Sequence, residues 1–177
     1  MTAEQYLQLG EDPPRIRLEL VEGEIAASPS PTPEHSFTGI HLILLLGIYI
    51  ETNGLGELHR DVDTILNQFT VRRPDILFFS TARRHLIGKK AMQGPPDLAI
   101  EVISPSSIEV DRVDKFAQYR EAGVAHYWIV DPIGKTIEAF RLDGNQFIAS
   151  GRGQQKDVVK LQPFLDLEIP LARLWRE

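Results

Sequence analysis

The chain has 177 residues, of which 42% are hydrophobic and 25% are charged, values ordinary for a globular protein. This length predicts a single domain over residues 1–177. The composition excludes collagen-like, fibrous and disordered proteins. Because the sequence contains no cysteine, disulfide frameworks, thiol nucleophiles and Cys-ligated metal sites are also excluded.

The N-terminal segment does not resemble a targeting signal. It carries Glu4, Glu11 and Asp12, whereas a signal peptide begins with basic residues and continues as an apolar run. The most apolar window, Ile40–Ile50, is shorter than the roughly 20 residues of a membrane span. We therefore expect a cytoplasmic protein that does not associate with membranes.

Basic residues are concentrated in one segment of an otherwise acidic chain. The net charge of −6 argues against nonspecific coating of nucleic acid. Within residues 72–90, however, Asp75 is the single acid among six basic residues: Arg72, Arg73, Arg83, Arg84, Lys89 and Lys90. Such a band is typical of a polyanion-binding surface and also of a solvated loop.

The first predicted element is a β-hairpin, followed by a long helix. Ile16–Val21 and Glu24–Ser28 read as two strands. The proline-rich run at 28–33 then interrupts regular structure, and Thr32 is a predicted N-cap for a helix that begins at Pro33. This helix is expected to end near Thr52. Because it is apolar nearly all round, we expect it to be central and packed on two sides.

The middle of the chain predicts strands and a βαβ unit. The predicted strands are Gly56–His59, Asp63–Asn67, Asp75–Phe79, Asp97–Ile103 and Ala125–Val130. Residues 80–96 form a long connection of a length that is often functional. Ser106 and Glu109 match a capping box for a helix to about Ala122, which would link two parallel strands.

The C-terminal third predicts an antiparallel hairpin, Thr136–Leu142 with Gln146–Ala149. The stretch after it, with Pro163 and Pro170, is expected to wrap the surface and end in a short helix containing Trp175. The predicted architecture is thus an α/β domain with a mixed β-sheet, a central N-terminal helix and a β-hairpin at each end.

Two predicted strands carry an acid in an apolar environment. In Asp97–Ile103, alternation places Glu101 on one face with Ala99 and Ile103. Asp75 begins another apolar strand. A buried carboxylate costs several kcal/mol unless it is compensated, and an oxygen-preferring ion such as Mg²⁺ would compensate both if the strands are neighbours.

A simpler interpretation pairs each acid separately with an arginine such as Arg72 or Arg73. The next predicted helix supplies another cation, Lys115, four residues after Asp111. Asp111 and Lys115 form either a surface ion pair or a pair in which Lys115 reaches toward Glu101.

An ordered series of segments resembles the Uma-two family of restriction-endonuclease-like proteins, within the PD-(D/E)XK nuclease superfamily. The segments are Leu20–Glu24, Pro33–His35, Pro74-Asp75, Pro96–Ser106, Asp111-x-x-x-Lys115, Tyr119-x-x-x-Gly123 and Tyr127–Pro132. The resemblance covers roughly residues 15–170 and implies a restriction-endonuclease-like fold that acts on DNA.

The resemblance also implies roles for single residues. Asp75 and Glu101 match the metal-binding acids, with the backbone carbonyl of Val102 as a further ligand. The position where a strand lysine is expected holds Ile103, and Lys115 on the following helix matches its replacement. The implied cofactor is Mg²⁺ or Mn²⁺.

Two further residues are candidates for the site. His35 lies on the first turn of the central helix and matches a family histidine, which makes it a candidate metal ligand; capping or core packing is the alternative. Glu24, in the hairpin, is either an additional acid near the site or an exposed strand charge.

The leading hypothesis is a Mg²⁺-dependent endonuclease that hydrolyses DNA, with Asp75, Glu101 and Lys115 as catalytic residues. The six basic residues would contact the nucleic-acid backbone, and a homodimer would allow cleavage of both strands. The alternative is a catalytically weak or inactive nuclease-fold module that binds nucleic acid or a protein. A paired-carboxylate hydrolase acting on another substrate, such as a glycoside, is a third hypothesis.

Overall fold

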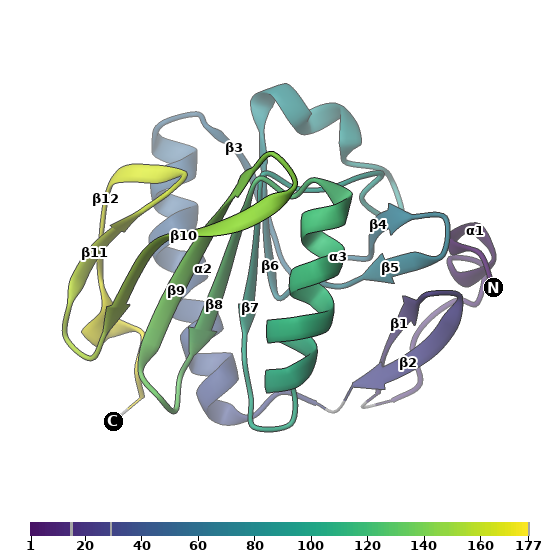
Figure 1. The fold of residues 1–177 in the computed structure, drawn as a ribbon, viewed down its shortest axis with the longest axis horizontal. Coiled ribbons are helices and arrows are strands. Elements are labelled where there is room, and N and C mark those ends of the chain that lie inside the picture. Colours follow the sequence, from purple (N-terminus) through teal and green to yellow (C-terminus); the bar gives the residue numbers. More distant parts are fainter. Residues whose placement is uncertain (15, 29, 177) are drawn as a thin grey trace.

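The structure, a computed structural model, describes residues 1–14, 16–28 and 30–176. Two helices cover opposite faces of a mixed central sheet (Figure 1). The helices of the described ranges are α1 (Ala3–Tyr6), α2 (Pro33–Thr52) and α3 (Lys115–Ala122), with 3₁₀ turns at Thr81–Leu86 and Leu171–Arg173. The strands are β1 (Arg17–Val21), β2 (Glu24–Ser28), β3 (Gly56–His59), β4 (Thr64–Asn67), β5 (Thr70–Arg72), β6 (Ile76–Ser80), β7 (Leu98–Val102), β8 (His126–Asp131), β9 (Thr136–Asp143), β10 (Gln146–Gln154), β11 (Val158–Leu161) and β12 (Phe164–Pro170).

The strand order of the central sheet is β10-β9-β8-β7-β6-β3. β7 and β8 run parallel, whereas the other neighbouring pairs are antiparallel. The chain from β7 through α3 to β8 is therefore the predicted βαβ unit, and the predicted mixed sheet is confirmed. A smaller sheet, ordered β2-β1-β5-β4, lies beside α3 and contains the predicted N-terminal hairpin (Figure 1).

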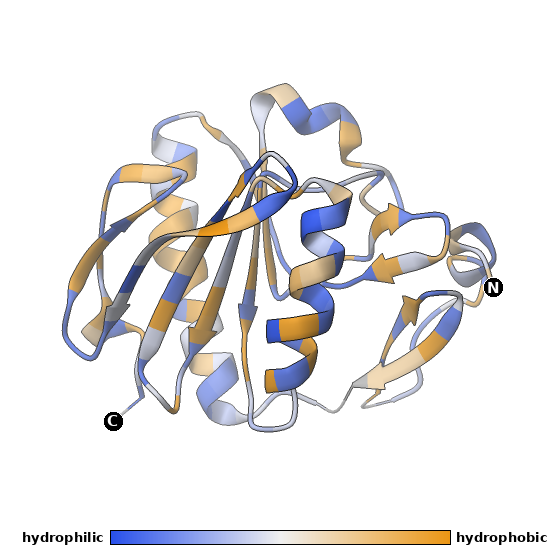
Figure 2. Ribbon diagram, in the orientation of Figure 1, coloured by the Kyte–Doolittle hydropathy of each residue, from blue (hydrophilic) through white to orange (hydrophobic). Residues whose placement is uncertain are grey.

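Burial along the strands follows their position in the sheet. All residues of β7 are buried, as expected for a central strand covered on both faces. Hydrophobic and hydrophilic residues alternate along β9 (Figure 2), and this strand buries Ile137 and Ala139. The single polar side chain of β7, Glu101, is therefore buried with its apolar neighbours and sealed from bulk water.

The long helix α2 begins as predicted but packs on one side. The Thr32 hydroxyl accepts a hydrogen bond from the His35 backbone N–H at 3.2 Å, which caps the helix and places His35 in the first turn. The row that faces the sheet is buried: Thr38, Leu42, Leu46 and Ile50. The opposite row, Ile40, Leu44 and Ile48, is 46%, 52% and 66% exposed. The expectation of packing on two sides was wrong, because the described chain covers only the sheet-facing row.

Among the helices described, α2 is also long and apolar enough to cross a membrane by length and composition. The core helix of a globular domain meets the same criteria. Its buried row packs into the main core, as expected for such a core helix.

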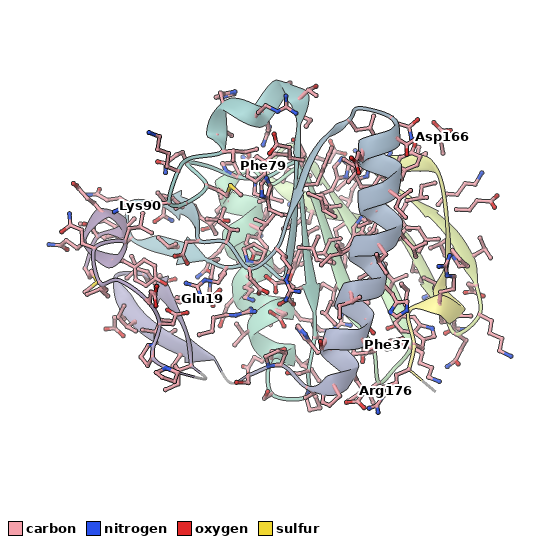
Figure 3. All side chains as sticks on the ribbon, turned by 180° about the vertical axis from the view of Figure 1, so that it is seen from behind. Glu19, Phe37, Phe79, Lys90, Asp166 and Arg176 are labelled. Carbon is pink, nitrogen blue, oxygen red and sulfur yellow. The ribbon has the colours of Figure 1, made fainter. Side chains whose placement is uncertain are left out.

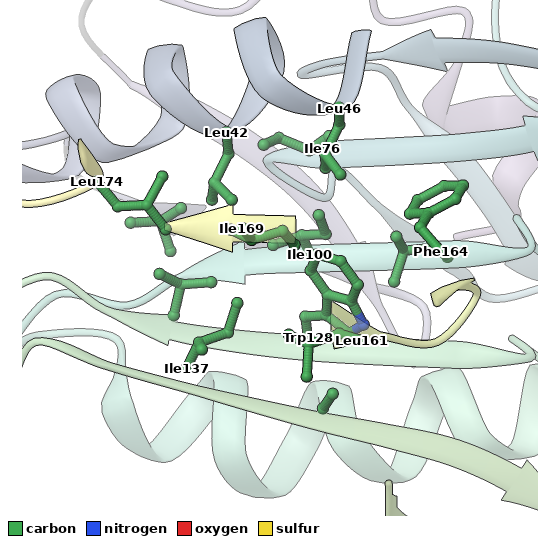
Figure 4. Close-up of a cluster of buried hydrophobic side chains, with 14 of the residues drawn as sticks. Leu42, Leu46, Ile76, Ile100, Trp128, Ile137, Leu161, Phe164, Ile169 and Leu174 are labelled. Carbon is green, nitrogen blue, oxygen red and sulfur yellow. The ribbon is translucent and has the colours of Figure 1, made fainter. Parts of the chain in front are cut away.

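The C-terminal segment forms part of the main core instead of wrapping the surface. Strands β11 and β12 pair as a hairpin beside the central sheet, and they bury Leu161, Phe164 and Ile169 against α2 and β8 (Figure 4). The indole N–H of Trp128 donates to the Gln162 carbonyl oxygen at 2.8 Å. Sequence reasoning missed these strands because the prolines obscured their alternation. Trp175 follows the last 3₁₀ turn and does not lie within it.

The connection from β7 to α3 differs from the predicted capping box. The Ser104 backbone N–H donates to the Ser107 hydroxyl at 2.9 Å, and the Ser107 carbonyl oxygen accepts from the Asp111 N–H. Ser107 therefore organises the turn that was assigned to Ser106 and Glu109. A π-helical turn, Val110–Asp114, then leads into α3 and buries Asp111. Pro29, in the predicted proline-rich break, lies outside the described residues.

The one-sided packing of α2 predicts unequal effects of truncating its leucines. Leu46→Ala removes a fully buried side chain and should lower the free energy of unfolding by about 2–5 kcal/mol. Leu44→Ala, on the exposed row, should change it by about 0.5 kcal/mol or less. Urea unfolding of both variants measures the difference, and similar losses would contradict this packing.

Candidate metal and nuclease site

The register of two antiparallel strands places two acids opposite each other at one end of the strand pair. β6 and β7 pair Ile76 with Ile100. Asp75, the residue before β6, therefore comes opposite Glu101, the residue after Ile100. Alternation turns both away from the α2 face and toward α3. Both line a cavity of about 150 Å³, so the structure brings together two carboxylates that are 26 residues apart in the chain.

Asp75 is bound by groups from three elements. Its Oδ2 atom accepts a hydrogen bond from the Val102 backbone N–H at 2.8 Å and lies 3.0 Å from His35 Nε2. Its Oδ1 atom lies 3.3 Å from Arg17 Nη1. The start of α2 and the start of β1 thus meet at the end of β7, and His35 is within contact of a predicted metal ligand.

Glu101 is held between a hydroxyl and an ammonium group of α3. The Tyr119 hydroxyl donates to Glu101 Oε1 at 2.6 Å, and Lys115 Nζ lies 3.0 Å from Oε2. Lys115 also lies 3.0 Å from Asp111 Oδ1. Lys115 and Tyr119 thus contact Glu101 from one face of α3, and Asp111 of the preceding π-helical turn holds Lys115. Asp111 and Lys115 are a buried pair rather than the surface pair that was the alternative.

The environments of the two acids push their pKa values apart. Burial alone would raise the pKa of Asp75, but the hydrogen bond and charge of His35, with Lys115 and Arg17, lower it to about 2. Burial raises the pKa of Glu101 well above its usual value, and Asp75 and Asp111 add to that shift against the opposing effect of Lys115. Two buried carboxylates at one place repel each other, which is the situation that a shared cation relieves.

Lys115 remains charged in this environment. Burial alone would lower the pKa of its ammonium group, but the carboxylates of Glu101, Glu19 and Asp111 outweigh that effect and raise the pKa above its usual value. Lys115 therefore carries a positive charge at neutral pH, and it cannot take a proton from water.

A second buried pair supports the site from the smaller sheet. Glu19 of β1 lies in the interior between that sheet and α3 (Figure 3). Its Oε2 atom lies 3.0 Å from Arg72 Nη1, and Arg72 Nε donates to Gln118 at 2.7 Å. Arg72 thus joins β1 and β5 to α3, next to Lys115. This network fixes the helix that carries the site lysine.

This network corrects part of the predicted cationic surface. Arg72 is 2% exposed, so it is not available to a nucleic acid. Arg73 binds Asp63 at 3.0 Å and also binds Asp12, so its charge is largely compensated. Neither of these two arginines pairs with Asp75 or Glu101. Asp75 does pair with another arginine, Arg17, whereas Glu101 pairs with Lys115, so the simpler interpretation holds for Asp75 only.

The remaining predicted basic residues lie away from the cavity. Arg83 lies 3.4 Å from Asp97, and Arg84 lies 2.7 Å from Glu57. Lys89 and Lys90 are exposed, and Lys90 lies at the outer edge of the molecule (Figure 3). Glu24 is exposed in β2 and is absent from the described residues that line the cavity, so the structure does not bring it to the site.

Three residues of the site escaped sequence reasoning as functional groups. Arg17 and Glu19 lie two residues apart in β1 and therefore share one face of the strand. Two charged residues on the same strand face were the available signal. Tyr119 belongs to a segment of the family resemblance, but no function was assigned to it from the sequence. Its spacing of four from Lys115 was the signal that both face β7.

The donor chemistry of the cavity fits a hard divalent ion. Mg²⁺ is commonly bound through one or two carboxylates and keeps several waters, and Asp75 with Glu101 provides two. In the part of the chain that the structure describes, no group of three or more His, Asp or Glu side chains is arranged as a preformed metal site. Arg17 and His35 at Asp75, and Lys115 at Glu101, already contact carboxylate oxygens that a bound ion would use.

Comparisons with known proteins identify the family and the fold of the chain. The model of a family described as "Putative restriction endonuclease" (Uma2) matches residues 3–172. A crystal structure from Anabaena variabilis ATCC 29413, described as "a putative nuclease belonging to DUF820", superposes with a TM-score of 0.80 at 19% identity, covering 98% of this chain and 97% of that one. No curated protein matches the sequence. The restriction-endonuclease-like fold that the resemblance implied is confirmed.

The lowered pKa of Asp75 predicts part of the acid dependence of stability. Its folded value of about 2 lies below the ordinary 3.8, so the unfolded chain binds this proton more readily. The stabilisation is complete above about pH 4 and is lost as the pH falls through about 2. Without divalent ions, Asp75→Asn should reduce the loss of unfolding free energy between about pH 5 and about pH 2 by about 2 kcal/mol.

Urea unfolding at the two pH values measures this loss. Asp166→Asn is the control, because Asp166 is exposed on β12 at the opposite edge of the molecule (Figure 3). Equal acid dependence in wild type and Asp75→Asn would contradict the assigned environment.

Proposed function

The chain belongs to the Uma2 family, and we propose that it is a Mg²⁺- or Mn²⁺-dependent endonuclease that hydrolyses DNA phosphodiester bonds. The observation that carries this proposal is the meeting of Asp75 and Glu101 in one cavity, with Lys115 3.0 Å from Glu101. Two buried acids and one permanently charged lysine match what phosphodiester hydrolysis requires, because charge increases on the phosphate in the transition state.

The residues that would hold the ion are Asp75, Glu101 and the Val102 carbonyl, with His35 as a further candidate beside Asp75. When bound, a hard divalent ion supplies a more acidic water and neutralises charge on the scissile phosphate. The Val102 N–H fixes one oxygen of Asp75 and the Tyr119 hydroxyl fixes one oxygen of Glu101. Each carboxylate is thereby oriented before any ligand arrives.

Lys115 would stabilise negative charge on the phosphate rather than act as a base. Its ammonium group is held by Glu101 and Asp111 at the cavity wall. Because its pKa is raised, the proton of the attacking water has to leave by another route.

DNA would contact basic residues on the connection between β6 and β7. Lys89 and Lys90 are exposed there, and the side chain of Arg84 is 60% exposed despite its pair with Glu57. These would serve as sequence-independent contacts to phosphates. Cleavage of both strands would require a second site, and a cytoplasmic homodimer is part of this proposal. The exposed row of α2 offers apolar surface for such a contact.

The alternative function is a nuclease-fold module that binds nucleic acid or a protein without cleaving. Two observations favour it: the net charge is −6, and the strand position expected to hold a lysine is Ile103. The two functions differ in metal dependence. A binding module would bind DNA equally with and without Mg²⁺ and would form no product.

The test is DNA cleavage by three purified variants. Asp75→Asn and Glu101→Gln should each lower Mg²⁺-stimulated cleavage at least about 100-fold, because each removes a charged ligand and an oriented oxygen. Asp166→Asn should cleave like the wild type, and circular dichroism should show the same fold for all. Chelation with EDTA should abolish activity.

Cleavage that persists in both site variants would contradict the nuclease assignment. Cleavage that needs no metal would favour a paired-carboxylate hydrolase instead.

A further inference from the structure

Asp75 and Glu101 each have one oxygen in contact with a basic side chain, and at Asp75 that side chain is Arg17. In each, one oxygen is held by a group that also orients the carboxylate: Val102 N–H on Asp75 Oδ2 and the Tyr119 hydroxyl on Glu101 Oε1. The other oxygen faces a basic side chain, Arg17 on Asp75 and Lys115 on Glu101. His35 Nε2 also lies 3.0 Å from Asp75 Oδ2, the oxygen that the Val102 N–H already binds. The two basic groups thus lie against the oxygens that a metal ion would need, and they neutralise the acids in its absence.

The two basic side chains are held differently. Lys115 is 7% exposed and is fixed on α3 between Glu101 and Asp111. The side chain of Arg17 is 24% exposed, lines the cavity and lies at 3.3 Å from Asp75, a longer contact than that of Lys115 with either acid. His35, the other side chain at Asp75, lies closer to it, at 3.0 Å, and is less exposed, at 16%. Arg17 is therefore the group that a cation at Asp75 would displace more easily.

Asp61 gives Arg17 a second anchor outside the cavity. Arg17 Nη2 contacts Asp61 Oδ1, while Asp61 Oδ2 accepts from Arg60 Nε at 3.0 Å and from Arg60 Nη2 at 2.7 Å. If Arg17 loses Asp75, its contact with Asp61 keeps the guanidinium group at the cavity wall. A guanidinium group held there by one edge leaves its other N–H groups free, and their planar fork suits a phosphate.

We propose that Arg17 occupies the place of the metal ion at Asp75 in the metal-free protein and, when the ion binds, turns to the DNA phosphate next to the scissile bond. This inference rests on the proposed function. Metal binding removes the acceptor on Asp75 and adds a repelling positive charge, so the freed guanidinium group gains a phosphate partner only when the site is loaded. Arg17 is thus a positioning residue that makes DNA binding depend on the metal.

Arg17→Gln should have opposite effects on two ligands. Removing the competing cation should tighten Mn²⁺ binding at least about fivefold, measured by isothermal titration calorimetry without DNA. In the presence of Mn²⁺, the same variant should bind a double-stranded DNA oligonucleotide about tenfold more weakly than wild type, measured by fluorescence anisotropy on ice with gel verification that the DNA is intact. A residue with only a structural role would weaken both.

Two further variants serve as controls. Arg60→Gln removes the same charge from Asp61 but does not contact Asp75, and its Mn²⁺ affinity should stay within about twofold of wild type. Arg17→Lys keeps the competing charge and loses the planar fork. It should bind Mn²⁺ like wild type and lose most of the metal-dependent gain in DNA affinity.

The outcomes separate this inference from the proposed function. If wild type and Arg17→Gln bind Mn²⁺ equally, or if the variant binds it more weakly, the role of Arg17 is overturned while the nuclease proposal stands. If wild type binds no Mn²⁺, the proposed function fails and this inference fails with it. Tighter Mn²⁺ binding together with weaker DNA binding in Arg17→Gln, but not in Arg60→Gln, would support the inference.

Discussion

The burial of two like charges at the end of one strand pair is the constraint on which the site depends. Asp75 and Glu101 are 8% and 1% exposed, so neither is solvated well enough to be ionised without partners. The protein supplies those partners from three elements: Arg17 from β1, His35 from α2, and Lys115 with Tyr119 from α3. These three elements therefore meet at the end of β7 that carries Glu101.

Each layer of the fold contributes to that compensation. The parallel step from β7 to β8 requires a crossover helix, which lays α3 over the face to which Glu101 points. The cap at Thr32 starts α2 next to Asp75 and places His35 there. The smaller sheet closes the cavity with β1 and fixes α3 through Glu19 and Arg72. The hydrophobic core on the other face of the sheet contains none of these polar groups.

Much of this could be predicted from the sequence because it depends on local periodicity. Alternation in Asp97–Ile103 placed Glu101 on the face opposite Ile100, and the Thr32-Pro33 pair predicted the start of α2 correctly. The convergence of the acids required one long-range assumption, that β6 and β7 are neighbours, and the register bears it out. The family resemblance supplied the fold that periodicity alone left open.

What the sequence could not reveal depends on tertiary partners. A run of arginines looks cationic in a sequence, but Arg72 is buried against Glu19, which lies 53 residues earlier in the chain. The apolar surface of α2 predicted contacts on two sides, although the described chain provides one. The prolines of the last strands concealed a hairpin that completes the core. In each case the deciding contact joins segments that no local pattern relates.

If Asp75 and Glu101 hold one divalent ion between them, a crystal soaked in Mn²⁺ and measured at an anomalous wavelength will reveal it. We expect one strong anomalous peak within about 2.0–2.3 Å of a carboxylate oxygen of each residue. Arg17 should then be withdrawn from Asp75. Both carboxylates still bound to Arg17 and Lys115, with no peak between them at saturating Mn²⁺, would contradict a shared ion.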